Sequence, residues 1–261
     1  MPFTFSHPAA VLPLLNRGRA RGRLVASALL IGSMAPDLPY FAGSFALGDV
    51  THAWWGVPTV DVAVTAVLAA LWHLVLRAPL VALLPARWAG AAELLTAPRA
   101  GLRRPGAAEV LWFALSAAIG AGTHVGWDAF THPRRFGTRL IPVLQSGSLF
   151  GRPLYTTLQY GSSAVAIVLL AGYALRELRR AADAGGRPCA VVLGRGGRRL
   201  VLAGTAVAAV LGAGYRIDRW ARPGTGLFDL IPTVAFGSIA GVGAALLCYA
   251  VVARRTAVTG P

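Results

Sequence analysis

The 261-residue chain is 56% hydrophobic and only 13% charged, with a mean hydropathy of +0.60. So little charge argues against a soluble globular protein of this length. The formal net charge is +15, and all basic residues are arginine, since the sequence has no lysine. The arginines form short clusters between apolar segments, without interleaved aromatic side chains to stack bases, so nucleic-acid binding is not expected.

Apolar segments long enough to cross a membrane recur along the whole sequence. A helix needs ~20 residues to cross ~30 Å of hydrocarbon. The sequence therefore predicts an all-α fold, a polytopic transmembrane helix bundle with about six spans. In chain order the expected spans are 24–47, 58–84, 107–131, 160–176, 200–217 and 227–252. We expect one integral membrane domain over 1–261, in which 1–175 carries the motifs and 176–261 adds further helices.

The distribution of arginine predicts the orientation of the chain. With six spans and both termini on one side, most of the 25 arginines fall in the loops on that side. The positive-inside rule then favours cytoplasmic termini. The N-terminus lacks a basic start and a small-residue cleavage site, so we do not expect a removable signal peptide. Cys189 and Cys248 are not expected to pair.

The first predicted span contains an ionisable residue, Asp37, in the sequence GSMAPDLPY. Ionisable side chains inside a membrane are costly, so a functional role is the default hypothesis. Pro36 and Pro39 flank the aspartate and disturb the helix there. The alternative is that Asp37 caps a broken helix or pairs with an arginine.

The third predicted span ends in GTHVGWDAFTH, which contains a histidine and an aspartate at helical spacing. His124 and Asp128 are four residues apart, so a helix places both side chains on one face, within reach of one metal ion. His132 continues this face, although Pro133 makes a helix end equally plausible there. The alternative is that His124 and Asp128 form a hydrogen-bonded pair that holds helices together.

Two further histidines are candidate ligands. His52 lies in the loop DVTHAWW, at the same end of the bundle as His124; beside Trp54 and Trp55, an interfacial role is the alternative. His7, in FSHPAA, precedes the arginine cluster. It can join the site only if the N-terminal segment folds back into the bundle or the first span does not fully cross. We leave out His73, which has no acidic neighbour. Imidazole and carboxylate ligands suit zinc, and also manganese or iron.

A second polar cluster follows the third span. Arg134, Arg135 and Arg139 lie on the arginine-poor side, joined later by Arg152. Guanidinium groups bind phosphate and carboxylate well, so these arginines are candidates for binding a phosphate-bearing headgroup next to the metal. The alternative is that they contact bulk lipid headgroups.

An ordered set of motifs carries a resemblance to known families. These are the opening MPFTFSHPAAVLPLL, then IGSMAPDLPYF, the Thr-His pair at 51–52, THVGWDAFTHP and PLYTTLQYGSS. Together they resemble an uncharacterised bacterial membrane family, a domain of unknown function, over roughly residues 1–175. More distantly, the pattern is similar to membrane-bound metal-dependent hydrolases and, through them, to zinc-dependent phospholipase C.

That distant resemblance implies a set of metal ligands and a location. The matching positions are His7, Asp37, His52, His124 and Asp128. The sequence departs from the hydrolase pattern where a second Asp-His often follows Pro-Asp, because Leu38-Pro39-Tyr40 stands there. The family implies the cytoplasmic membrane of a bacterium. The substrate, the metal and the oligomeric state stay open.

The leading hypothesis is a membrane-embedded, metal-dependent hydrolase of a phosphoester or related bond in a lipid-like substrate. Asp37 would be either a ligand or the general base for a metal-bound water. The first alternative is a non-catalytic membrane protein whose His/Asp cluster is structural or only binds metal. The second is a transporter that uses Asp and His as an ion relay, which paired broken helices would favour.

Overall fold

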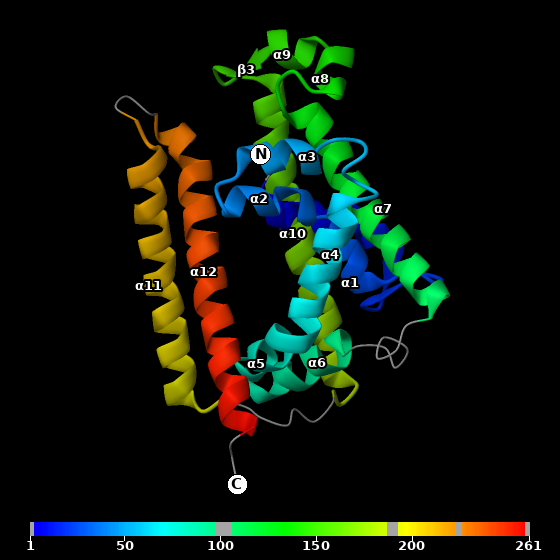
Figure 1. Ribbon diagram of the computed structural model, residues 1–261, viewed down its shortest axis with the longest axis vertical. Coiled ribbons are helices and arrows are strands. Elements are labelled where there is room, and N and C mark those ends of the chain that lie inside the picture. Colours follow the sequence, from blue (N-terminus) through cyan, green and yellow to red (C-terminus); the bar gives the residue numbers. More distant parts are fainter. Residues whose placement is uncertain (1–2, 98–105, 187–192, 223–225, 259–261) are drawn as a thin grey trace. The chain divides into compact units, whose positions relative to one another are not determined.

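The computed structural model describes residues 3–97, 106–186, 193–222 and 226–258 (Figure 1). The fold is all-α, as predicted. Five helical segments are long and apolar enough to cross a membrane: Val60–Ala82, Ala107–Thr131, Leu154–Asp183, Arg195–Trp220 and Leu230–Arg255. They correspond to the second to sixth predicted spans and identify a multi-pass membrane protein. Cys189 and four arginines used for the orientation, at 99, 103, 104 and 187, lie outside the described residues.

The first predicted span, 24–47, is not a single helix. It consists of α1 (Ala26–Gly32), the 3₁₀ turn η2 (Ala35–Asp37), α2 (Leu38–Phe41) and the start of α3 (Phe45–Thr51). Pro36 and Pro39 lack the N–H groups that a continuous α-helix would need at this point. Asp37 therefore lies in a tight turn between short helices. The five membrane-length helical segments of the described residues agree roughly with the predicted count of about six spans.

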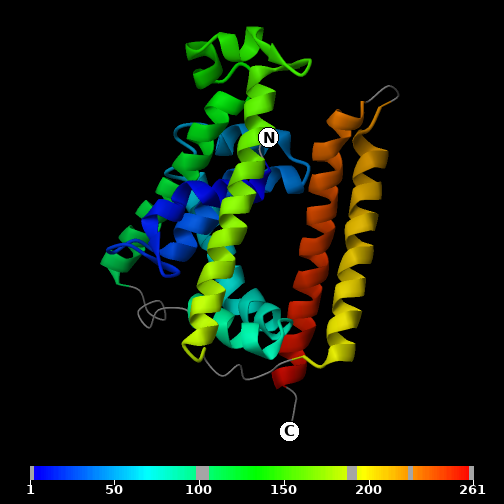
Figure 2. The ribbon, with the colours of Figure 1, turned by 180° about the vertical axis from the view of Figure 1, so that it is seen from behind.

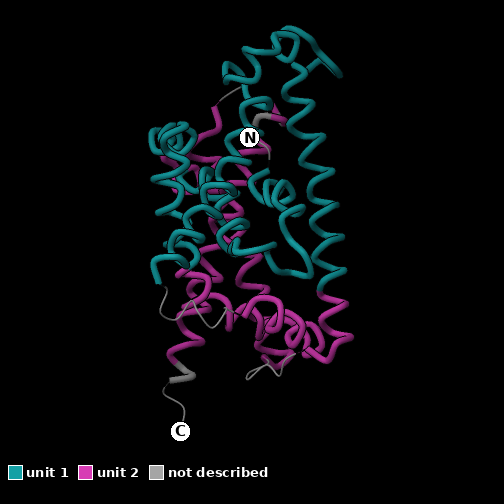
Figure 3. Tube along the Cα trace, turned by 90° about the vertical axis from the view of Figure 1, so that its right-hand side faces the viewer, with its two compact units in different colours: residues 1–39, 45–69, 99–177 teal, residues 40–44, 70–98, 178–261 magenta. Residues whose placement is uncertain are grey.

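The chain divides into two compact units (Figure 3). Unit 1 contains Met1–Pro39, Phe45–Ala69 and Arg99–Glu177, and unit 2 contains Tyr40–Ser44, Ala70–Pro98 and Leu178–Pro261. The motifs that the sequence analysis singled out lie in unit 1, except for Tyr40 and Phe41 at the end of IGSMAPDLPYF.

Unit 1 is built around the long helix α7 (Ala107–Thr131). The 3₁₀ helix η1 (Thr4–Leu14) leads through a hairpin of β1 (Leu15–Asn16) and β2 (Arg19–Ala20) to α1. Val11, Leu15 and Leu29 form a buried core beneath it. Figure 2 shows the dark-blue N-terminal segment between α7 and α10 (Leu154–Asp183). The N-terminal segment therefore folds back among the helices of unit 1. This is one of the two arrangements that would allow His7 to join the site.

Two glycines allow α1 and α7 to approach each other closely. A Cβ added to Gly32 would lie 2.5 Å from the carbonyl oxygen of Ala117, and one added to Gly120 would lie 2.4 Å from that of Leu29. Both distances are too short for any larger residue. Small residues commonly permit such contacts between membrane helices. This contact places the C-terminal end of α1 beside the half of α7 that carries His124.

Short elements complete unit 1. The helices α8 (Phe136–Leu140) and α9 (Val143–Ser146) follow α7, and the hairpin of β3 (Ser148–Leu149) and β4 (Arg152–Pro153) leads into α10. Figure 1 shows this group at the common end of α7 and α10. The first part of α4 (Val60–Leu71) also belongs to unit 1.

Unit 2 contains the remaining membrane helices. Its elements are the π-helical turn η3 (Trp72–Leu76), α5 (Arg77–Ala82), α6 (Ala86–Thr96), α11 (Arg195–Trp220) and α12 (Leu227–Val258). Glycines at 212, 237 and 241 bring α11 and α12 into backbone contact. Pro79 has no N–H to donate to the carbonyl of Val75, and Nε of Arg254 donates to that carbonyl at 2.9 Å. This hydrogen bond satisfies a half-buried acceptor inside a membrane segment.

Candidate metal centre

Four potential metal ligands meet in unit 1, and three separate segments provide them. Asp37 ends η2, His52 directly follows α3, and His124 and Asp128 lie one turn apart on α7. One donor atom from each of these residues lies within 4.8 Å of the other three. All four side chains are buried, with Asp37 and His124 fully so. This four-residue cluster could hold a metal ion.

The distances between donor atoms fit two ligands on one ion better than a hydrogen bond. Nε2 of His52 is 3.4 Å from Oδ2 of Asp128, and Nε2 of His124 is 3.6 Å from that oxygen. Oδ1 of Asp37 is 3.5 Å from Nε2 of His124 and 3.6 Å from Nε2 of His52. An N–H···O bond is typically about 2.9 Å. Two ligands at about 2.0–2.1 Å from a tetrahedral zinc ion would be about 3.3 Å apart.

The backbone orients both imidazole rings of the cluster. Nδ1 of His124 is 2.8 Å from the carbonyl oxygen of Ser33, and Nδ1 of His52 is 2.8 Å from that of Gly48. A carbonyl can only accept, so each Nδ1 carries the proton and donates it. The lone pair of each Nε2 then points toward the cluster. Metal-bound histidines characteristically show this arrangement.

The two carboxylates are also held in place. The hydroxyl of Thr4 donates to Oδ2 of Asp37 at 2.6 Å, which leaves Oδ1 facing the cluster. Among the described residues, neither Oδ1 of Asp37 nor Nε2 of His124 has a hydrogen-bond partner, although both are buried. Buried polar atoms without partners are uncommon in native proteins and call for an explanation. A bound cation would satisfy both atoms.

His7 lies beside the cluster but is not one of the four residues. Its Nε2 is 3.6 Å from Oδ1 of Asp128, the carboxylate oxygen that faces away from His52 and His124. The side chain of His7 is 4% exposed. Burial lowers the pKa of His7 to about 3, and His124 adds to this effect. His7 is therefore neutral at pH 7, which is the form of imidazole that binds a metal ion.

His132 also contacts Asp128. Its Nδ1 lies 3.4 Å from Oδ2 of Asp128 and 3.2 Å from the backbone oxygen of the same residue. Its Nε2 lies 3.5 Å from the side-chain nitrogen of Gln159 on α10. Burial lowers the pKa of His132 to about 4. His132 directly follows α7, so it both ends the helix and contacts Asp128.

The three arginines proposed to bind an anion lie just beyond this point. Arg134 and Arg139 are exposed, and Arg135 is half-buried where α8 begins. Within the described part of the chain, their guanidinium groups make no hydrogen bond or ion pair with the four-residue cluster. Thr138 donates to the carbonyl oxygen of His132 at 2.9 Å, which fixes the path of the arginine-bearing segment after α7.

One acidic residue near the site escaped the sequence analysis. Asp61, in the first turn of α4, is fully buried, and neither of its carboxylate oxygens has a hydrogen-bond partner among the described residues. It interacts electrostatically with His124. Thr65, one turn later, is also fully buried, and its hydroxyl has no hydrogen-bond partner among those residues. The sequence could have indicated Asp61, because it is an acidic residue within a predicted span, as Asp37 is.

The donor set determines which chemistry is available. Two neutral imidazoles and two carboxylates suit zinc, and also manganese or iron. Such an ion lowers the pKa of a bound water and polarises phosphoryl or carbonyl oxygens. Since no ligand atom comes from a mobile surface side chain, the site is preformed.

Comparison with known proteins identifies the family. No curated protein and no solved structure matches the chain. A family model described as a domain of unknown function, DUF4184, matches residues 1–251, which extends the predicted match well beyond residue 175. The chain therefore belongs to the DUF4184 family.

Proposed function

We propose that this protein is a membrane-embedded, metal-dependent hydrolase that cleaves a phosphoester or related bond in a lipid-like substrate. The observation that carries the proposal is the buried four-residue cluster, in which the imidazole Nε2 atoms lie 3.4–3.6 Å from the carboxylate oxygens. Backbone-oriented imidazoles support metal binding over a simple network of side-chain hydrogen bonds. The cluster lies among helices that are suited to a membrane, which supports a lipid as the substrate.

The residues divide into three roles under this proposal. His52, His124 and Asp128 hold the ion, and Asp37 joins them through Oδ1 while Thr4 fixes its Oδ2. His7 lies beside Asp128, and its buried Nε2 has no hydrogen-bond partner among the described residues, so we assign it to accept a proton at that nitrogen. When bound, the ion supplies an acidic water and a positive charge.

The arginine segment completes the proposed site. Arg134, Arg135 and Arg139 orient the anionic group of the substrate by charge-assisted hydrogen bonds. Their exposure favours a ligand that arrives from outside the protein. We assign the protein to the inner membrane of a bacterium with cytoplasmic termini, on the resemblance and the arginine distribution.

An ion relay is the second candidate function, and Asp61 is the observation that favours it. A fully buried carboxylate without a hydrogen-bond partner in the described residues is typical of proton pathways in membrane transporters. Proton flux in proteoliposomes, measured on wild type and Asp61→Asn, separates a transporter from an enzyme.

The metal content of the detergent-purified protein tests the proposed function first. Elemental mass spectrometry should find about one zinc, manganese or iron ion per chain in wild type and none in His124→Ala or Asp128→Ala. His73→Ala, a histidine outside the cluster, is the matched control and should keep the ion. The proposal is wrong if wild type holds no stoichiometric ion after purification without chelators and metal add-back. Phosphate release from phospholipid vesicles then tests the reaction.

A further inference from the structure

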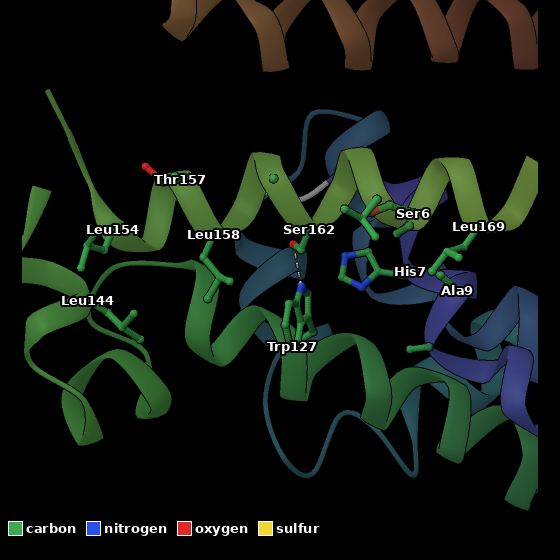
Figure 4. Close-up of a pocket in the computed structure, with 14 residues that line it drawn as sticks. Ser6, His7, Ala9, Trp127, Leu144, Leu154, Thr157, Leu158, Ser162 and Leu169 are labelled. Atoms are coloured by element: carbon green, nitrogen blue, oxygen red, sulfur yellow. Dashed lines mark hydrogen bonds between the residues drawn. The ribbon is translucent and has the colours of Figure 1, made fainter. Parts of the chain in front are cut away.

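A long apolar groove runs beside the metal centre in unit 1. Its volume is about 760 Å³ (Figure 4). One wall is a single face of α10, with Leu154, Leu158, Gly161, Val165 and Leu169 spaced three or four residues apart. At about 1.5 Å per residue, this face extends over roughly 22 Å of helix.

The opposite wall comes from three other elements. Ala9 and Ala10 of η1, Trp127 of α7 and Leu144 of α9 line it. In Figure 4, Trp127 and Ser162 meet across the groove, where the indole nitrogen donates to the serine hydroxyl at 3.2 Å. Ser6, His7 and Thr157 are the other polar residues of the lining, and the rest is apolar, so the groove suits a hydrocarbon chain better than a sugar or a peptide.

The groove opens toward the lipid phase. The α7 and α10 helices are both suited to cross a membrane. Val165 and Leu169 on the rim are 60% and 57% exposed. In a bilayer, the medium beside these helices is hydrocarbon, so a lipid chain can enter sideways without crossing water.

His7 connects the groove to the metal centre. Figure 4 shows its ring at the groove, between Trp127 and Leu169. Its Nε2 is 3.6 Å from Oδ1 of Asp128. We propose that the groove holds one hydrocarbon chain of a bilayer lipid, and that His7 marks where this chain passes the metal centre. The inference rests on the proposed function, because the lipid in the groove is the substrate of that site.

Two glycines on α10 provide a matched pair of variants. A Cβ added at Gly161 or at Gly172 meets no atom within 4 Å, so a larger side chain fits at both positions. Gly161 lines the groove and Gly172 does not. Gly161→Phe should fill the groove, whereas Gly172→Phe should leave it open.

Whether a lipid chain occupies the groove can be tested by the fluorescence of Trp127. The protein is placed in vesicles of phosphatidylglycerol with brominated acyl chains, whose bromine atoms quench a nearby tryptophan. The contribution of Trp127 is obtained by subtracting the fluorescence of the corresponding Trp127→Phe variant from that of each protein. We expect strong quenching of this contribution in wild type and Gly172→Phe, and a loss of at least half of the quenching in Gly161→Phe. Equal quenching in the two phenylalanine variants would overturn the proposal, because Trp127 would then sense only bulk lipid.

Metal content, measured on the same samples, keeps the two proposals apart. All variants should retain the ion, since none replaces a residue of the four-residue cluster. Groove-dependent quenching in a protein that binds no metal would support the lipid site and reject the hydrolase. A bound metal with equal quenching in both phenylalanine variants would reject only the lipid site.

Discussion

The imidazole ring of His7 stacks on that of His124, with the ring centroids 3.6 Å apart and the planes 14° from parallel. This contact joins the N-terminal segment to the C-terminal half of α7. It covers one face of a cluster histidine with a neutral ring, and it places His7 where the metal centre and the apolar groove meet. The N-terminal segment is therefore part of the site.

Two substitutions of His7 distinguish the packing of its ring from its role as a proton acceptor. His7→Phe keeps an aromatic ring over His124, so we expect it to retain about one metal ion per chain, while hydrolysis falls at least tenfold because the proton acceptor is lost. His7→Ala also opens the stack and should lower the metal affinity. Metal competition assays and lipid turnover measure both effects. Loss of the ion from His7→Phe would instead make His7 a required ligand.

Thr4 tests whether the support of Asp37 matters. Thr4→Val removes the 2.6 Å hydrogen bond to Oδ2 of Asp37 with little change in shape. Loss of such a contact typically weakens metal binding by ~10–100-fold, and we expect an effect in that range. Thr205→Val, which removes only a local bond to the carbonyl of Val201 on α11, is the control. Unchanged affinity in Thr4→Val would show that Asp37 does not need this anchor.

The close contact of α1 and α7 should be sensitive to one methyl group. Gly120→Ala would place a Cβ 2.4 Å from the carbonyl oxygen of Leu29, so the helices must move apart. Such overpacking typically costs ~1–3 kcal/mol. It should also weaken metal binding, because Ser33 would no longer hold His124. Gly126→Ala on the same helix meets no atom within 4 Å and should leave both thermal stability and metal affinity unchanged.

Much of the helical architecture follows from local sequence. Apolar stretches of membrane-spanning length predicted the long helices, and the four-residue spacing of His124 and Asp128 predicted their shared face. Pro36 and Pro39 predicted a disturbed helix within the first span. The division of that span into α1, η2, α2 and α3 was not predicted, because hydropathy does not count missing N–H donors. The hydrogen bond from Thr4 and the proximity of Asp61 depend on contacts between distant segments, which no single-sequence pattern encodes.

Neutralising the arginine segment tests the orientation of the substrate. The triple variant Arg134→Gln, Arg135→Gln, Arg139→Gln should keep its metal ion, because none of these side chains contacts the four-residue cluster among the described residues. We expect the rate on an anionic phospholipid to fall at least tenfold, since a hydrogen bond to a charged group contributes ~1.5–3 kcal/mol. Arg19→Gln with Arg21→Gln, at exposed positions of the first hairpin, is the control for net charge. Equal rates in both variants would leave the segment without a role in catalysis.

Asp61 offers the sharpest distinction between the two candidate functions. Its carboxylate is fully buried and has no hydrogen-bond partner among the described residues, so a charge there is costly. We expect Asp61→Asn to keep the metal ion and to have a thermal midpoint at least as high as that of wild type, because the substitution removes a buried ionisable group. If the protein is a hydrolase in which Asp61 plays no part, turnover should be unchanged within about twofold. Retained metal with abolished proton flux in proteoliposomes would instead support the relay, because only a proton pathway needs an ionisable group at this position.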